Sequence, residues 1–239
     1  MNVVAFAVAA AAVFCGAAVQ GTIGFGLAVV AAPLVALTEP DWAPQVTLLA
    51  ALPMAIGVLV RDRGGFVWRR VRWVLLGRVP GTALGTWVLV HASSTVIAVV
   101  IAVTVLGAVG VSAYGWHVPI TPASAFSIGV ISAVTGTASS IGGPPLALLY
   151  QHEPADELRG SLASVFVFGV SLSLVAVTVA GEITAEHVLV AALLLPPLAL
   201  GLAASSWLRR RVDPERFRRL VLAGCCASAF ALLAQALFG

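Results

Sequence analysis

Charged side chains are scarce in this sequence, and lysine is absent from it. Only 10% of the 239 residues are charged, whereas 60% are hydrophobic. Water-soluble domains usually carry about a quarter charged residues, because charged groups cover their surface. The composition therefore excludes a water-soluble fold. Apolar stretches of about 18 residues recur along the whole length, which is what a helix needs to cross a bilayer core of about 30 Å. We predict an all-α integral membrane protein.

Groups that catalyse reactions or hold metals are also few. The ten acidic residues and the four histidines lie in loops or at the ends of apolar segments. The three cysteines, Cys15, Cys225 and Cys226, lie inside apolar runs without the spacing of metal ligands. Catalysis needs such groups within hydrogen-bond reach of one another. We expect no metal site, no cofactor, no enzymatic activity and no nucleic-acid partner.

The basic residues predict how the chain is oriented in the membrane. All 13 are arginine, and eleven of them fall in the segments 61–72 and 209–219. Short loops rich in arginine stay in the cytoplasm during membrane insertion. We therefore expect a multi-pass protein of the cell membrane with both loops cytoplasmic.

A weak internal repeat divides the chain into two transmembrane halves, 1–118 and 119–239. A shift of 116 residues superposes three pairs of residues, Gly26 on Gly142, Pro80 on Pro196 and Gly85 on Gly201. The arginine bias changes sides between the halves, because the segment 181–187, which corresponds to 61–72, has no arginine. Opposite bias is typical of inverted repeats in secondary transporters. We expect about eight transmembrane segments in two inverted repeats.

The number of crossings between the two arginine-rich loops predicts a hairpin in each half. Four apolar segments, 73–90, 95–113, 162–180 and 188–207, already separate the loops. Both loops are cytoplasmic only if the remaining stretch, 123–150, enters and leaves the membrane on the same side. It is expected to be a helical hairpin with its glycine-rich tip at 135–145. Residues 3–38 are its counterpart, which places both chain ends outside.

The glycine-rich tips are candidates for a solute site. They lack the preceding strand and the lysine of a phosphate-binding loop. Non-helical backbone at membrane depth is tolerated where it is buried in protein or lines a wet cavity. The helix N-terminus after each break favours an anion. Five polar side chains add hydrogen-bonding groups at this level: Gln20, Thr22, Thr137, Ser139 and Ser140. The alternative is that the glycines only allow helices to pack closely.

Arg78 is the one strongly intramembrane charge outside the loops. It lies six residues beyond Arg72, which is about 9 Å deeper along a helix. Its guanidinium suits an oxyanion, although the side chain could instead extend back to the cytoplasmic interface. Nearby Pro80, like Pro196 and Pro197 in the second half, is expected to kink its helix.

These segments together resemble a known family. The stretches GTIGFGLAVVAAPLVAL, GTASSIGGPPLALLY and RVPGTALG are similar to those of the TauE/SafE membrane permeases, also called sulfite exporters. The resemblance covers nearly the full length and implies a helical carrier of sulfite, sulfonates or related anions. By motif match, it implies a site at eight residues: Gly21, Gly24, Phe25, Gly26, Gly136, Gly142, Gly143 and Pro144. Ser139 and Ser140 replace part of the usual longer glycine run.

The sequence thus predicts a secondary transporter of a small anion, most directly sulfite or an organosulfonate, that works by alternating access at the glycine-rich breaks. A channel-like anion pore is an alternative, and an intramembrane enzyme or an assembly factor is another. The lipid bilayer and a small anionic solute are the expected partners. Protons as the coupling ion and a homo-oligomer are both compatible with the sequence, which leaves the direction of transport open.

Overall fold

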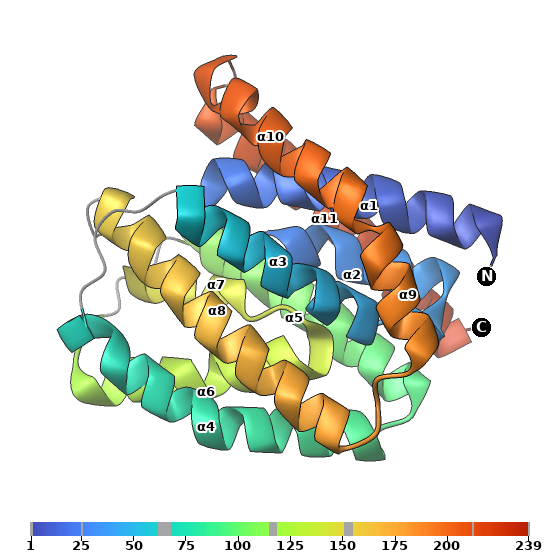
Figure 1. Cartoon of the computed structure of the whole chain (residues 1–239), viewed down its shortest axis with the longest axis horizontal. Helices are drawn as coiled ribbons and strands as arrows, with labels where there is room; N and C mark the ends of the chain where they lie inside the picture. The colour runs from blue at the N-terminus through green and yellow to red at the C-terminus, as the bar shows by residue number, and fades with distance from the viewer. Residues whose placement is uncertain are drawn as a thin grey trace.

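A computed structural model describes residues 2–24, 26–61, 68–114, 119–150, 155–211 and 213–238. Every regular element within these ranges is helical (Figure 1). In chain order the elements are α1 (Val3–Ile23), α2 (Leu27–Thr38), the short 3₁₀ helix η1 (Pro40–Trp42), α3 (Gln45–Arg61), α4 (Trp68–His91), α5 (Ser94–Tyr114), α6 (Pro122–Ser139), α7 (Gly143–Tyr150), α8 (Ala155–Val179), α9 (Ala185–Leu193), α10 (Leu195–Arg211) and α11 (Pro214–Phe238).

The helices are long and apolar enough for a membrane protein, as predicted. In the described ranges, five stretches could each cross a bilayer: Val3–Thr22, Val71–His91, Ser161–Val179, Ala185–Leu208 and Leu220–Phe238. Three apolar helices are shorter: Leu27–Thr38, Gln45–Arg61 and Ser94–Gly110. The all-helical membrane fold is therefore confirmed, whereas the expected number of about eight spans stays a prediction.

The first glycine-rich stretch is a turn between two antiparallel helices. The chain leaves α1 through Gly24, which is left-handed with φ 101° and donates its N–H to the Gln20 carbonyl. Gly26 follows with φ 137°. Both angles suit glycine because it has no Cβ. The Gln20 side chain then accepts a 3.0 Å hydrogen bond from the N–H of Leu27, the first residue of α2.

The second stretch makes a similar turn with a serine in the left-handed position. Ser140 follows α6 with φ 62°, and α7 begins at Gly143. The Ser140 hydroxyl donates to the Pro44 carbonyl at 2.8 Å and accepts from the Thr47 hydroxyl at 2.9 Å. These bonds hold the turn against the start of α3.

Small residues bring two helix pairs into close contact. On α4, Gly77 and Gly81 lie against the backbone carbonyls of Phe126 and Val130 on α6. On α10, Gly201 lies in the same way against a backbone carbonyl of α1. A methyl group at any of these glycines would come within 2.4 Å of a carbonyl oxygen. Packing of this kind holds helices together where water supplies no driving force.

The prolines have different effects in the two halves. α4 continues as one helix through Pro80, whereas the apolar stretch 188–207 is interrupted at Leu194, between α9 and α10. Pro196 and Pro197 therefore stand in the first turn of α10, where proline is tolerated because the first backbone N–H groups need no helical partner.

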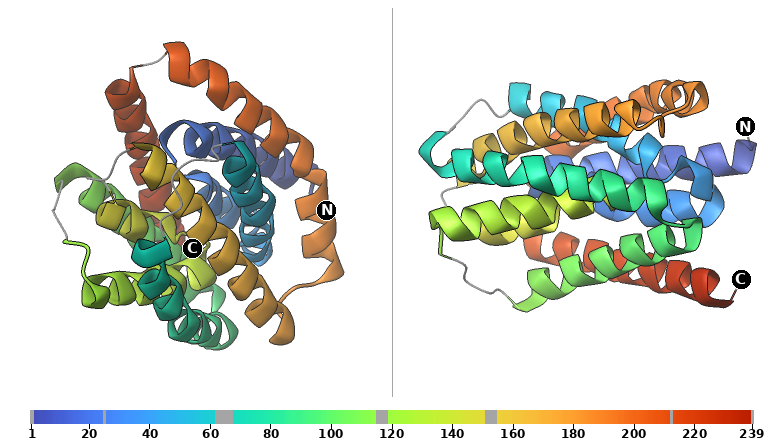
Figure 2. Two further views of the ribbon diagram at one scale, coloured as in Figure 1. Left: turned by 60° about the vertical axis from the view of Figure 1, so that its left-hand side comes forward. Right: turned by 90° about the horizontal axis from the view of Figure 1, so that it is seen from below.

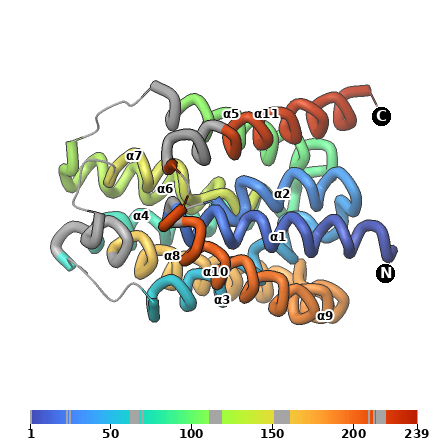
Figure 3. The backbone as a smooth tube through the Cα atoms, turned by 90° about the horizontal axis from the view of Figure 1, so that it is seen from above, coloured from blue at the N-terminus to red at the C-terminus, as the bar shows by residue number. Residues whose placement is uncertain are grey.

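Both chain termini lie at one end of the helical bundle (Figures 1 and 3). The last residues of α3 and α10, which flank the arginine-rich segments, lie toward the other end. α5 and α11 run side by side along the bundle (Figure 2). Both predicted loop segments, 61–72 and 209–219, are partly helical, since α4 begins at Trp68, α10 ends at Arg211 and α11 begins at Pro214. Residues 62–67 and 212 and the side chains of 214–219 lie outside what the structure describes.

Candidate functional site

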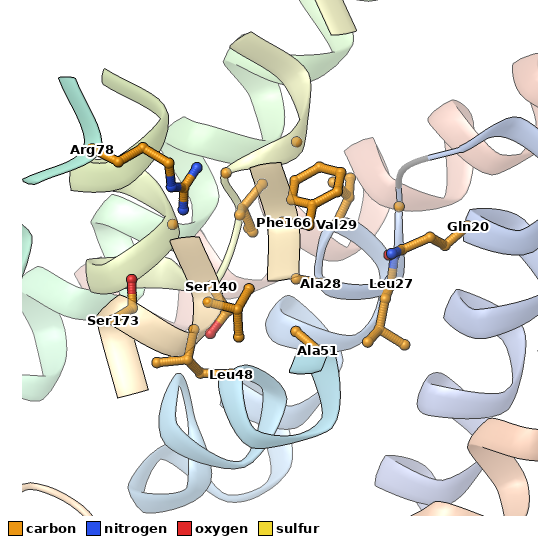
Figure 4. Close-up of a pocket in the computed structure, with 16 residues that line it drawn as sticks. Gln20, Leu27, Ala28, Val29, Leu48, Ala51, Arg78, Ser140, Phe166 and Ser173 are labelled. Atoms are coloured by element: carbon orange, nitrogen blue, oxygen red, sulfur yellow. The ribbon is translucent and has the colours of Figure 1, made fainter. Parts of the chain in front are cut away.

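Both helix breaks line one cavity in the interior of the bundle (Figure 4). Its volume is about 40 Å³, enough for about three water molecules. The first break contributes Gln20 and Gly26–Val29, and the second contributes Gly136 and Ser140–Gly143. α3, α4 and α8 complete the lining with Leu48, Ala51, Arg78, Phe166, Val170 and Ser173.

Arg78 brings a positive charge to this cavity. The side chain is 1% exposed, and its guanidinium points into the cavity from the side opposite Gln20 (Figure 4). Nη1 donates a 3.0 Å hydrogen bond to the Ser132 hydroxyl. Nε is buried without a hydrogen-bond partner, and no carboxylate in the described ranges forms an ion pair with Arg78. The charge therefore faces the cavity with unused hydrogen-bonding capacity.

Glycines on two neighbouring helices make room for the guanidinium. A Cβ at Gly169 of α8 would lie 1.8 Å from Nε of Arg78, so only glycine fits there with the arginine in place. A Cβ at Gly136 of α6 would lie 3.7 Å from Nη2, in ordinary contact. Arg78 therefore lies in a slot between α6 and α8 and does not extend to an interface.

Ser132 links Arg78 to the second break. Its hydroxyl accepts from Arg78 and donates to the Gly142 carbonyl at 2.6 Å. Gly142 packs closely on α6, since a Cβ there would lie 2.7 Å from the Ser132 carbonyl oxygen. A movement of the α6–α7 turn would therefore displace the partner that orients the arginine.

The opposite wall of the cavity is the beginning of α2. The N–H of Leu27 is capped by Gln20, while Ala28 and Val29 of the first helical turn line the cavity. The start of a helix carries a partial positive charge. Together with Arg78, this wall makes the cavity electropositive and suited to a small ligand that accepts hydrogen bonds.

The structure brings together some of the residues predicted from the sequence. Seven of them line the cavity: Gln20, Gly26, Arg78, Gly136, Ser140, Gly142 and Gly143. Thr137 lies one contact away, because its hydroxyl is 2.8 Å from that of the cavity residue Ser173. Ser140 lines the cavity, but its hydroxyl is bonded to Pro44 and Thr47 and serves the turn.

Other predicted residues have local roles outside the cavity lining. Gly21 packs against α10, where a Cβ would lie 2.2 Å from the Ser205 hydroxyl oxygen. The hydroxyls of Thr22 and Ser139 donate to carbonyls one turn earlier in their own helices, each at 2.7 Å. Gly24 shapes the first turn and faces open space.

Pro144 is buried in the first turn of α7 and does not line the cavity. Phe25 lies outside the described residues.

Sequence reasoning missed Ser132, Phe166, Gly169 and Ser173. Ser132 had a usable signal, because it stands four residues before Gly136 and so shares its helix face. The other three belong to α8, whose apolar sequence gives no sign of which face meets Arg78.

A second, wider cavity lies at the end of the bundle that holds the termini, and we call it the vestibule. Its volume is about 720 Å³. The carboxylate residues Asp41, Glu182 and Glu186 line it together with His187. The His187 ring accepts from the Thr184 N–H through Nδ1 at 3.2 Å, so Nε2 donates to the Asp41 carbonyl at 2.9 Å. Within the described ranges, no three histidine, cysteine or acidic residues form a group that could hold a metal ion.

Comparison with known proteins agrees with a membrane carrier. The family model described as sulfite exporter TauE/SafE matches residues 8–232. Comparison with curated proteins and with solved structures gives no significant match. The matched region includes both helix breaks, Arg78, three of the five candidate spans in full and most of the first and last spans. The chain is therefore a multi-pass membrane transporter that belongs to the TauE/SafE sulfite exporter family.

Proposed function

We propose that the chain carries a small oxyanion, sulfite or an organosulfonate, and binds it between Arg78 and the two helix breaks. The observation that carries this proposal is a buried guanidinium that faces a cavity and has no carboxylate partner in the described ranges. Removing a charge from water costs several kcal/mol unless a counter-charge accompanies it. A bound anion would supply that counter-charge.

Alternating access is the proposed mechanism, and the helix boundaries support the repeat on which it depends. α1 ends at Ile23 and α2 begins at Leu27. α6 ends at Ser139 and α7 begins at Gly143, and each of these positions lies 116 residues after its counterpart in the first half. The left-handed residues Gly24 and Ser140 are separated by the same interval. Two halves with this correspondence, 1–118 and 119–239, are what an internal duplication produces.

The packing between the halves supports the same relation. Gly201 of α10 lies against the Phe14 carbonyl and the Ala17 methyl group of α1. Gly81 of α4, one turn before Gly85, the counterpart of Gly201, lies against the corresponding groups of α6, the Val130 carbonyl and the Ala133 methyl group. Each hairpin thus packs on the long helix of the other half.

The direction of the hairpins is consistent with inverted halves. α1 starts at the end of the bundle that holds the termini, whereas α6 starts at the opposite end (Figures 1 and 2). In this arrangement the arginine-rich segments are cytoplasmic and the vestibule faces outward. Rocking of one half against the other would then expose the cavity to each side in turn.

Protons are the proposed coupling ion. The vestibule is lined by three carboxylates, of Asp41, Glu182 and Glu186, and by the imidazole of His187. Carboxylates also raise the local concentration of cations and oppose the approach of a free anion. An anion that crosses together with a proton would avoid part of this repulsion.

Flux into proteoliposomes tests the function. Labelled sulfite, sulfate, taurine and sulfoacetate are offered with and without a pH gradient. We expect saturable uptake of one anion, competition by its analogues, and a dependence on the gradient. Saturation and counterflow distinguish a carrier from a channel-like pore. Failure of the folded, inserted protein to move any of the four would contradict the proposed substrate class.

Variants of Arg78 test the site separately. Arg78→Leu removes the charge, and we expect it to abolish uptake. Arg78→Lys keeps the charge but loses the planar fork of donors, so we expect weaker uptake with a raised KM. Exposed Arg72 on the same helix provides the control Arg72→Gln. Uptake by Arg78→Leu equal to that of the unmodified protein would remove Arg78 from the site.

A further inference from the structure

Three polar side chains follow one another along a single face of α4. Arg78, Thr82 and Thr86 are spaced four residues apart, and a helix places such residues within an arc of about 80°. Thr82 is 2% exposed, and Thr86 is half-buried. The lipid-facing side of α4 is instead apolar, with exposed Val79, Leu84 and Trp87.

The hydrogen bonding of these side chains is incomplete. Nε of Arg78 and the hydroxyl oxygens of Thr82 and Thr86 are buried and have no hydrogen-bond partner. Threonine within a helix commonly donates to the carbonyl four residues earlier. Thr22 and Thr38 do so here, at 2.7 and 3.1 Å. The two α4 hydroxyls therefore differ from ordinary helical threonines of the same chain.

Both ends of this face meet a cavity. Arg78 lines the small cavity between the helix breaks, and Leu89, less than one turn beyond Thr86, lines the vestibule. From Arg78 to Leu89 the helix rises by about 16 Å and returns to nearly the same angular position. The only other buried, unpartnered side-chain atom in the described ranges is Oε1 of Gln45, which also lines the vestibule.

We propose that Arg78, Thr82 and Thr86 form a polar track by which an oxyanion passes between the inner cavity and the vestibule. The track rests on the proposed function, because Arg78 is its anion-binding end. The two hydroxyls replace hydration of the oxyanion oxygens along the part of α4 between the two cavities. Donors spaced along one wall suit a ligand with several acceptor oxygens, such as sulfite or the sulfonate group.

Thiol accessibility tests whether the track is wet. Thr82→Cys and Thr86→Cys are made in a chain whose Cys15, Cys225 and Cys226 are replaced by alanine. An anionic methanethiosulfonate is then added on the side of the termini. The cysteine thiolate attacks the reagent, forms a mixed disulfide with it and displaces methanesulfinate. Thiolates form in water and not in lipid, so we expect labelling at least about tenfold faster than at Leu84→Cys, the lipid-facing control. Labelling as slow as at Leu84→Cys would overturn the track.

Transport by hydroxyl-deleted variants tests whether the track serves the anion. Thr82→Val and Thr86→Val keep the side-chain shape, and we expect each to lower kcat/KM for uptake about tenfold. Thr82→Ser and Thr86→Ser keep the hydroxyl and should restore most of it. Thr38→Val, whose hydroxyl is bonded within α2, is the matched control. Equal transport by the valine variants would overturn the role of the hydroxyls.

The two measurements separate this proposal from the proposed function. Fast labelling at both positions in a protein that moves none of the four anions would uphold a wet track and refute the substrate class. Slow labelling in a protein that transports sulfite would refute the track and leave the transporter intact.

Discussion

Gly169→Ala is expected to disable the site by displacing Arg78 while the fold survives. The added methyl carbon would lie 1.8 Å from Nε, and ordinary van der Waals contact begins at 3.4 Å. The guanidinium must therefore move by about 1.6 Å, since α8 is held by its packing against α3 and α4. Because the arginine side chain is flexible, it takes up the movement more readily than the helix.

That displacement breaks the hydrogen bond that orients the arginine. Nη1 and the Ser132 hydroxyl are 3.0 Å apart, and Ser132 cannot follow because Gly142 holds it at 2.6 Å. A hydrogen bond that involves a charged group contributes about 1.5–3 kcal/mol, which corresponds to roughly a tenfold to hundredfold change in an equilibrium constant. We expect the affinity for the transported anion to fall by about that factor.

Uptake kinetics and thermal unfolding of the purified protein measure the two effects. We expect Gly169→Ala to raise KM strongly and to lower the free energy of unfolding by about 1–3 kcal/mol. The control is Gly107→Ala on α5, where the added methyl meets nothing within 4 Å. In an Arg78→Leu background, Gly169→Ala should lower the free energy of unfolding by less than it does alone, because the guanidinium that the methyl group would meet is absent. Unchanged uptake by Gly169→Ala would refute the slot between α6 and α8.

Three further predictions concern the first hairpin and its surroundings. Gln20→Glu keeps the acceptor for the Leu27 N–H but adds a negative charge to the cavity wall, so we expect unchanged thermal stability and strongly reduced uptake; equal uptake would contradict an anion at this wall. Gly26→Ala should lower the free energy of unfolding by about 1–3 kcal/mol in a denaturation assay, because φ is 137° and the methyl group would lie 2.8 Å from Val19. Gly107→Ala, the control, should leave the free energy of unfolding unchanged or raise it. Arg61→Gln should lower the free energy of unfolding by about 1–3 kcal/mol, since Arg61 donates to the Ser205 hydroxyl at 2.8 Å and to the Gly21 carbonyl at 2.9 Å. If Arg61→Gln destabilises the protein no more than Arg72→Gln does, these two hydrogen bonds are unimportant for stability.

Sequence reasoning located the helix breaks because their signals are local. Glycine at positions 24 and 26 permits the positive φ angles that end α1 and lead into α2. The 116-residue shift then indicated where the second break falls, although the left-handed residue there is Ser140, which local preference would not select. The length of the apolar segments was likewise enough to predict that the protein is built of membrane-spanning helices.

The roles of individual residues depended on contacts that local sequence does not encode. Gly21 and Gly26 stand in the same motif, yet one packs against Ser205 on a distant helix and the other lines the cavity. Gly169 is one small residue among the apolar residues of α8, and its importance follows only from the approach of Arg78. The sequence predicted a kink at Pro196 and Pro197, whereas the helix is interrupted at Leu194. Proline is tolerated in a first helical turn as well as at a kink, so its presence does not fix the position of the interruption.

The hydrogen-bond partner of Arg78 is the neutral hydroxyl of Ser132, and this affects how easily such a site can release an anion. A carboxylate beside the guanidinium would satisfy it permanently and would compete with any incoming anion. Ser132 instead orients the side chain through a neutral hydroxyl and leaves the positive charge uncompensated among the described residues. The resulting desolvation cost weakens the ligand-free state, so part of the binding energy of an anion relieves that cost. Transport needs binding strong enough to draw the solute in and weak enough to let it leave. Because Ser132 also holds Gly142, the alternating access proposed above predicts that a movement of the α6–α7 turn turns the guanidinium away and lowers the affinity for the anion.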